Sequence, residues 1–129
     1  MNSGTRGVTL DTGALLALER GDAFMRGILK RALEQDLRIH VPAGVIAQTW
    51  RGGPRQARIA RLLADPVVTV DVLDDVTARA VGVLCARSGH HDVVDVHVAL
   101  SAREHGHAVV TSDPDDIGLV DASLRIIAV

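Results

Sequence analysis

Aromatic side chains, cysteine and lysine are nearly absent from this 129-residue chain. Phe24 and Trp50 are the only Phe, Tyr or Trp residues, so the core must be aliphatic and no aromatic platform for stacking single-stranded bases is expected. The lone cysteine, Cys85, excludes an intramolecular disulfide. A formal net charge of −2 gives no sign of a strongly basic surface for nucleic acid or membranes.

The chain also lacks a recognisable signal peptide and a long uncharged apolar segment, so we expect a cytoplasmic protein with no membrane partner. Its length fits a single domain over residues 1–129, with the polar stretch 1–6 as a frayed terminus. Hydrophobic residues make up 47% of the sequence, which is enough for a sizeable core.

Short apolar stretches alternate with helical patterns. The expected strands are 7–10, 37–41, 67–72, 107–111 and 124–129; the expected helices are 14–19, 23–33, 44–50, 54–64, 76–87 and 92–105, with 112–121 as a loop that can contain a turn of helix. Asp22, Asp75 and Asp92 stand at expected N-cap positions. This alternation predicts an α/β fold, in which helices cover both faces of a parallel sheet.

Several carboxylates are expected at the carboxyl edge of such a sheet. Asp11 ends the first strand and Asp113 follows the fourth, so both should project from the carboxyl edge, where open α/β sheets bind ligands. Asp95 lies one turn into the helix that Asp92 opens, and residues three apart share a helix face. Asp116 follows Asp113 at the same spacing.

Clustered carboxylates with no lysine among them repel one another unless a cation is bound. An oxygen-only cluster suits Mg²⁺ or Mn²⁺, which can activate water and stabilise charge on a phosphodiester. The sequence therefore favours phosphoryl chemistry at a metal site.

Other interpretations of these residues stay open. Asp92 can be an ordinary N-cap, and Asp116 can belong to a turn after Pro114. Four arginines recur at helical intervals, either as a phosphate-binding flank or as a solvated helix face: Arg51, Arg55, Arg58 and Arg61.

Two weaker patterns point to other chemistry. His90, His91 and His97 lie near Asp92 but match no compact zinc motif, so a solvated loop is expected, with His97 as a candidate substrate contact. Asp11-Thr12-Gly13 also matches the aspartic-protease triplet, but those proteases are rich in β-structure and this chain has mostly helical patterns.

The order of these motifs resembles the PIN-domain family, and most closely the VapC-type ribonuclease toxins of toxin–antitoxin pairs. Leu10-Asp11-Thr12-Gly13-Ala14 resembles the family's opening strand with its first acid, and Asp95-Val96-His97-Val98-Ala99 its central acid on a helix of small residues. Val110-Thr111-Ser112-Asp113 resembles its late strand and acid, and Asp116-Ile117 a further acidic pair. The likeness runs from about Val8 to Val129.

This resemblance implies a three-layer α/β/α sandwich around a parallel sheet. It implies Mg²⁺- or Mn²⁺-dependent endonucleolytic cleavage of RNA, with Asp11, Asp95 and Asp113 on the metal and Asp116 as a further catalytic acid. Supporting roles are expected for Asp92 and Thr111, and RNA contacts for Arg51, Arg55 and Arg58. A cognate antitoxin and a homodimer are the implied protein partners.

One departure from the family pattern concerns the helix after the second strand, where Gln48 occupies the position of an expected Glu. Glutamine retains an oxygen ligand but carries no charge, so metal affinity or turnover should fall unless Asp92 compensates. A metal-dependent ribonuclease is thus the first hypothesis, and a catalytically weak or inactive module that binds RNA or a partner protein is the alternative. A phosphatase acting on a small substrate is a third.

Overall fold

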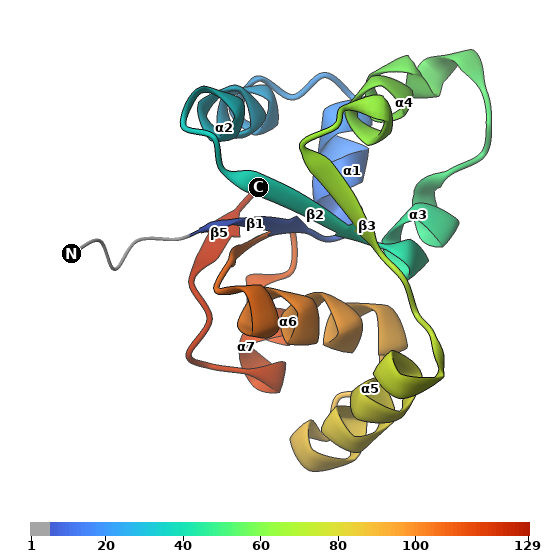
Figure 1. The fold of residues 1–129 in the computed structure, drawn as a ribbon, viewed down its shortest axis with the longest axis vertical. Helices are drawn as coiled ribbons and strands as arrows, with labels where there is room; N and C mark the ends of the chain where they lie inside the picture. The colour runs from blue at the N-terminus through green and yellow to red at the C-terminus, as the bar shows by residue number, and fades with distance from the viewer. Residues whose placement is uncertain (1–5) are drawn as a thin grey trace.

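The computed structural model describes residues 6–129, so the terminus expected to fray at 1–6 lies, apart from Arg6, outside the described residues. The backbone N–H of Arg6 donates to the Gly106 oxygen, and its backbone oxygen accepts from the Arg38 N–H, each at 3.3 Å. Five parallel strands form one sheet in the order β3-β2-β1-β4-β5 (Figure 1). Their bounds are β1 Gly7–Leu10, β2 Arg38–Pro42, β3 Val68–Asp71, β4 Ala108–Thr111 and β5 Ile126–Ala128.

Seven α-helices and one 3₁₀ turn connect these strands. They are α1 Thr12–Glu19, α2 Ala23–Glu34, α3 Ala43–Thr49, the 3₁₀ turn Pro54–Gln56, α4 Ala57–Ala64, α5 Asp75–Ser88, α6 Val93–His105 and α7 Pro114–Val120. Helices α1, α2 and α4 cover one face of the sheet, and α6 and α7 cover the other, with α5 outside α6 (Figure 1). The expected α/β/α sandwich is confirmed. Across the described residues, no helix combines the length and apolar character needed to cross a membrane.

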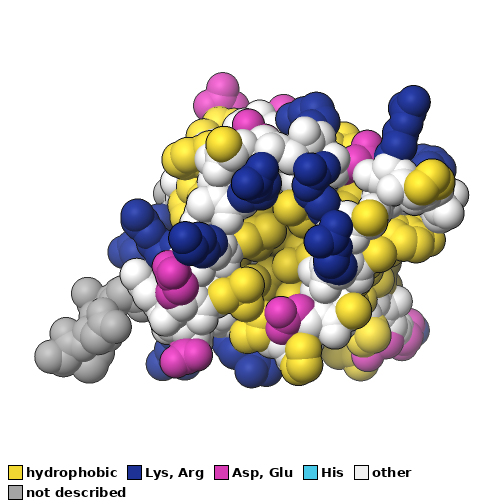
Figure 2. Space-filling view, turned by 90° about the horizontal axis from the view of Figure 1, so that it is seen from above, with side chains coloured by type: hydrophobic (Ala, Val, Ile, Leu, Met, Phe, Trp, Pro, Cys, Tyr) yellow, Lys and Arg dark blue, Asp and Glu magenta, His cyan; other side chains and the backbone are white. Residues whose placement is uncertain are grey.

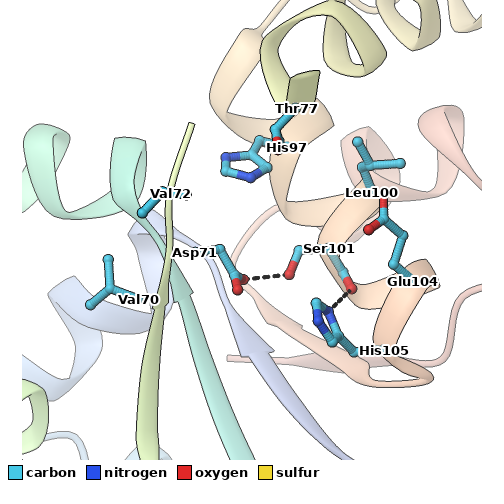
Figure 3. Close-up of a pocket in the computed structure, with 9 residues that line it drawn as sticks. All are labelled: Val70, Asp71, Val72, Thr77, His97, Leu100, Ser101, Glu104 and His105. Carbon is cyan, nitrogen blue, oxygen red and sulfur yellow. Dashed lines mark hydrogen bonds between the residues drawn. The ribbon is translucent and has the colours of Figure 1, made fainter. Parts of the chain in front are cut away.

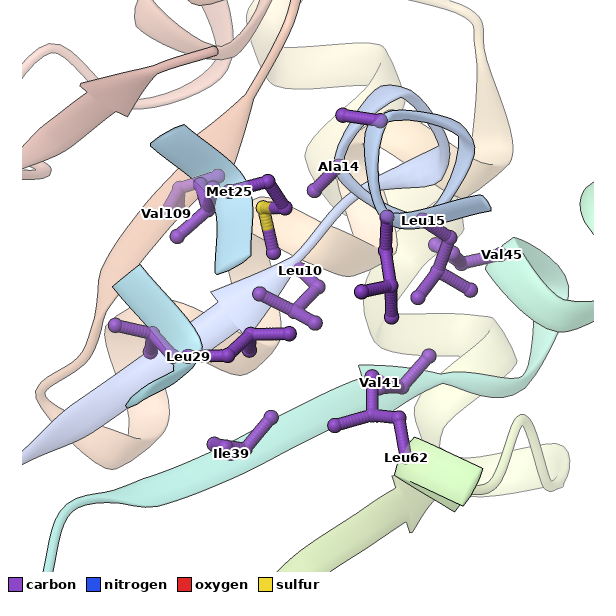
Figure 4. Packing of buried hydrophobic residues seen from close by; sticks show 14 of the residues in the cluster. Leu10, Ala14, Leu15, Met25, Leu29, Ile39, Val41, Val45, Leu62 and Val109 are labelled. Atoms are coloured by element: carbon purple, nitrogen blue, oxygen red, sulfur yellow. The ribbon is translucent and has the colours of Figure 1, made fainter. Parts of the chain in front are cut away.

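The core is aliphatic, as the composition predicts. Leu10 of β1 and Val41 of β2 are fully buried against Leu15 of α1 and Met25 of α2 (Figure 4). Burying one such side chain contributes roughly 1.5–3 kcal/mol relative to leaving it exposed. This packing fixes the start of α1, and therefore Asp11, at the end of the central strand.

The second face of the sheet is more polar. In β2, His40 lies between Ile39 and Val41, which both belong to the apolar core, so the alternation of the strand turns His40 to the opposite side. Its imidazole is buried and contacts the ring of His105 at the end of α6. Thr9 of β1 is aligned with His40 in the sheet. Polar side chains thus line part of the layer between the sheet and α6.

Several details differ from the sequence-based expectations: β5 begins at Ile126 rather than at residue 124, and the helix expected over 54–64 opens with a 3₁₀ turn. The N-cap of α5 is Asp74, whose Oδ1 accepts from the Thr77 N–H at 2.9 Å, while Asp75 is the first helical residue. The stretch 112–121, expected as a loop with a turn of helix, contains the seven-residue helix α7, because Pro114 suits a first helical turn and Ile117 and Val120 are buried three residues apart. Strand β3 also ends at Asp71, one residue before the expected limit.

Candidate metal centre

Asp11 links the central strand to the first helix. Its Oδ1 accepts a hydrogen bond of 2.8 Å from the Ala14 N–H and thereby caps α1, and the Thr111 hydroxyl also bonds its carboxylate. Only 3% of the residue is exposed. The carboxylate is therefore held rigidly at the carboxyl edge of the sheet.

Burial raises the pKa of Asp11 above its ordinary value, although the bonds from Thr111 and Ala14 lower it. The negative charges of Asp95 and Asp113 raise the same pKa further. Asp95 of α6 and Asp113, which follows β4, are therefore close enough to repel the charge of Asp11 at the end of β1. The position of α6 at this edge, which the sequence could not fix, is the one needed for that convergence.

Asp95 lies in the first turn of α6 and is held by a histidine. Its Oδ2 is 3.0 Å from Nε2 of His90, in the loop before the helix. Burial raises the pKa of Asp95 above its usual value, the His90 bond lowers it, and the charges of Asp92 and Asp116 raise it. Asp92 is the N-cap of α6, with its Oδ1 3.0 Å from the N–H groups of Val94 and Asp95.

Helix α7 brings a further acid to this site. Asp116 lies in its first turn, and one ligand atom each from His90, Asp95 and Asp116 lies within 4.8 Å of the other two. Asp113 precedes the helix and is exposed, and its backbone N–H donates to the Thr111 hydroxyl at 2.8 Å. Thr111, expected as a supporting residue, therefore bonds both the Asp11 carboxylate and the backbone N–H of Asp113.

Two glycines permit the elements to approach closely around these acids. A Cβ on Gly13 would lie 1.8 Å from Oγ of Ser112, so the start of α1 packs directly on the β4–α7 junction. A Cβ on Gly44 would lie 3.0 Å from Cγ2 of Val94, which brings the start of α3 against the start of α6. Both close approaches are possible because glycine has no Cβ.

Gln48 of α3 is exposed and adjoins the site through α1. Its side-chain Oε1 accepts a hydrogen bond from the hydroxyl of Thr12, the residue after Asp11. Gln48, which was expected at the family's Glu position, is therefore bonded to the residue next to Asp11.

The predicted RNA-contacting arginines follow α3 and are all exposed. One guanidinium N–H of Arg51 donates to the backbone oxygens of Trp50 and Ala47, at 2.7 and 3.3 Å. Arg58 donates to the Glu19 backbone oxygen at 3.3 Å. These bonds fix the stems of two arginines on the surface, and the structure gives no contact between them and the acids.

His90 and His91 were expected in a solvated loop; both lie in a loop and His91 is exposed, but His90 turns its ring toward Asp95. Its ring is 17% exposed and bonds Asp95, and this bond raises the pKa of His90 above its ordinary value. Its position two residues before Asp92 indicated that it lies near the acidic residues. The loop geometry that turns its ring toward Asp95 has no sequence signature. His97 is buried and lines a different cavity, so the structure does not bring it to the acids.

The residues at this edge suit a divalent cation. His90, Asp95 and Asp116 offer a nitrogen and two hard oxygen ligands within 4.8 Å of one another, and Asp95 also acts electrostatically on Asp11, as does Asp113. Such ligands are compatible with Mg²⁺ and especially with Mn²⁺. The raised pKa values of Asp11 and Asp95 reflect burial and repulsion that a bound cation would offset. Fold and site together define an α/β domain with an acidic centre at the carboxyl edge of its parallel sheet.

Comparison with known proteins agrees with this description. The PIN-domain family matches residues 8–122, and the chain belongs to that family. PIN domains are typically metal-dependent nucleases. No curated protein sequence matches the chain.

Two solved structures are similar in fold. One is that of FitAB bound to IR36 DNA fragment, with 15% identity, a TM-score of 0.65, and 94% of each chain covered. The other is that of FitAcB from Neisseria gonorrhoeae, with 16% identity and a TM-score of 0.62, covering 93% of this chain and 96% of that one.

Proposed function

We propose that the protein is a metal-dependent endoribonuclease of the VapC-toxin type. The observation that carries the proposal is the convergence of Asp95 and Asp113 on Asp11, whose pKa both charges raise although the three acids come from separate elements. Belonging to the PIN-domain family supports the same chemistry.

In this proposal Asp11, Asp95 and Asp113 hold Mg²⁺ or Mn²⁺, directly or through water, and Asp116 is a further acid. The bound ion would activate water for attack on a phosphodiester and neutralise developing charge. Thr111 fixes the orientation of the Asp11 carboxylate, and His90 does the same for Asp95. Arg51, Arg55 and Arg58 hold the RNA backbone by charge.

A cognate antitoxin and a second copy of the chain are the proposed protein partners. The similar structures of FitAB and FitAcB support an antitoxin. The face that carries α1 and α2 shows an apolar hollow bordered by Lys and Arg side chains (Figure 2). Between α2 and the sheet lies a cavity of about 510 Å³ that includes Phe24, Ile28 and Ile127. Exposed Val76 and Val83 on α5 support self-association.

Cleavage of RNA by an Asp11→Asn variant tests the proposal. Asparagine caps helices as well as aspartate does, so the variant should fold but lose metal-dependent cleavage. Asp22→Asn is the matched control, because Asp22 caps α2 in the same way, at 2.9 Å from the Met25 nitrogen. This control should cleave at the wild-type rate. A folded Asp11→Asn protein that cleaves RNA as fast as the wild type would refute the proposal.

A second candidate is a PIN module that binds RNA or a partner protein with little or no catalysis. The observation that favours it is Gln48, a neutral side chain already bonded to Thr12. Wild-type protein that binds RNA without cutting it in Mn²⁺ would support this candidate over the first.

A further inference from the structure

A second cluster of metal-binding side chains lies between β2, β3 and α6. His40 projects from β2, Asp71 ends the neighbouring strand β3, and His105 ends α6. His105 lies ten positions after Asp95 on α6, which is about 15 Å along the helix axis. The cluster is therefore distinct from the acidic centre.

The ligand atoms of this cluster are already close together. Nδ1 of His40 is 2.8 Å from Oδ1 of Asp71, and the rings of His40 and His105 have centroids 4.4 Å apart. One ligand atom from each residue lies within 4.8 Å of the other two. Tetrahedral Zn²⁺ with bonds near 2.1 Å holds its ligands about 3.4 Å apart, so only small side-chain rotations are needed.

Hydrogen bonds around the cluster orient two of its members. Nδ1 of His105 is 2.8 Å from the Ser101 backbone oxygen, which can only accept, so this nitrogen carries the proton and Nε2 carries the free lone pair. The Ser101 hydroxyl donates to Oδ2 of Asp71 at 2.5 Å (Figure 3). Such outer bonds are the kind that fix tautomer and orientation at protein metal sites.

An open cavity gives an ion access to these residues. It has a volume of about 260 Å³, and its walls include Asp71, Ser101 and His105, together with His97 and Glu104 (Figure 3). The cavity leaves room for a water ligand. Two imidazole nitrogens and one carboxylate oxygen favour Zn²⁺ or a neighbouring transition ion over Mg²⁺.

We propose that His40, Asp71 and His105 form a binding site for a divalent transition-metal ion, with Zn²⁺ as the best match. The ion joins the edge strand β3 and its neighbour β2 to the last turn of α6. One coordination position faces the cavity and takes water or an exchangeable ligand.

Metal titration of the full chain tests this site, with Zn²⁺ followed by calorimetry and Co²⁺ by its visible absorption. His105→Gln removes one ligand from an exposed position, so the fold should be kept. His90→Gln is the matched control, since it removes the imidazole of the acidic centre instead. His105→Gln should weaken one Zn²⁺ site by at least about tenfold, while His90→Gln leaves that site unchanged.

Long-range ¹H–¹⁵N spectra of the histidines provide the second measurement. Zn²⁺ should shift the ring nitrogens of His40 and His105 in the wild type and in His90→Gln. The proposal is overturned if wild-type protein binds no Zn²⁺ at micromolar concentration. It is also overturned if binding survives His105→Gln and disappears in His90→Gln, because the ion would then occupy the acidic centre.

Discussion

The side-chain oxygen of Gln48 accepts a hydrogen bond from the hydroxyl of Thr12, the residue that follows Asp11. A carboxylate in place of this amide would add a negative charge beside the acidic centre. Gln48→Glu should therefore increase Mg²⁺ or Mn²⁺ affinity severalfold, measured by calorimetry, and should increase any RNA cleavage.

Gln35→Glu is the control for Gln48→Glu, because it adds the same charge at an exposed position at the end of α2. It should leave metal affinity unchanged. Equal affinities in the wild type and Gln48→Glu would mean that this position does not act on the metal.

The double role of Asp11, as helix cap and as buried acid, can be separated by two substitutions. In metal-free protein, Asp11→Asn should be at least as stable as the wild type, because it keeps the cap and removes a charge that burial and repulsion disfavour. Asp11→Ala loses the cap and should cost about 1 kcal/mol. Urea unfolding in the presence of a metal chelator measures the free energy of unfolding of both variants. The difference between Asp11→Asn and Asp11→Ala isolates the cap, because both variants remove the charge. If Asp11→Asn is less stable than the wild type, the repulsion inferred at this site is absent.

The contact between Gly13 and Ser112 should control the spacing between Asp11 and Asp113. Gly13→Ala places a methyl group within 1.8 Å of Oγ and 2.5 Å of Cβ of Ser112, so the β4–α7 junction must move. We expect lower metal affinity and a stability loss of about 1–3 kcal/mol.

Ser112→Gly relieves that clash, so the double variant Gly13→Ala/Ser112→Gly should recover most of the metal affinity. Ser112→Gly alone should bind metal like the wild type. Additive effects in this double-mutant cycle would contradict the proposed spacing role.

His107 should make the stability of the metal-free protein depend on pH. Burial, followed by the nearby His40 and His105, lowers the pKa of His107 to about 4 from its ordinary 6.5. Between these values the unfolded chain binds a proton that the folded protein does not, so stability rises with pH. The contribution is complete above pH 6.5 and is lost as the pH falls toward 4.

Urea unfolding from pH 4 to 7 with a chelator measures this slope. His107→Asn keeps a polar atom near the Nδ1 position that lies 3.1 Å from the Thr9 hydroxyl, and it removes the titration. Its slope should be smaller than that of the wild type. Identical slopes would show that His107 is not the group responsible.

The sheet was predictable because its strands have strong local patterns. The expected strand over 7–10 matches β1 Gly7–Leu10, and Asp22 and Asp92 cap α2 and α6 as their sequence positions indicate. Only a turn of helix was expected where α7 lies, because its seven residues are held mainly by two buried side chains, Ile117 and Val120, rather than by a long periodic pattern. Local propensity is weak evidence for so short a helix.

Side-chain pairing across elements was harder to foresee. Asp11 and Asp113 could be placed together from strand topology, but the partners of Asp95 depend on how α6 docks. The pairing of His40 with Asp71 requires the register of β2 and β3, in which Pro42 lies opposite Asp71. No sequence spacing reveals that a residue at one strand's end reaches a ring on the next strand.

Helix α6 has opposite electrostatic character at its two ends. The peptide dipoles of its 13 residues sum to roughly half a positive charge at the start and half a negative charge at the end. The start, beside Asp95, stabilises anions, which suits carboxylates and an approaching phosphate but opposes a cation. The end, at His105, stabilises cations. The two ends of one helix therefore act on a bound cation in opposite ways. Metal at the first turn must be held by carboxylate charge against the helix dipole, whereas metal at the last turn is stabilised by that dipole.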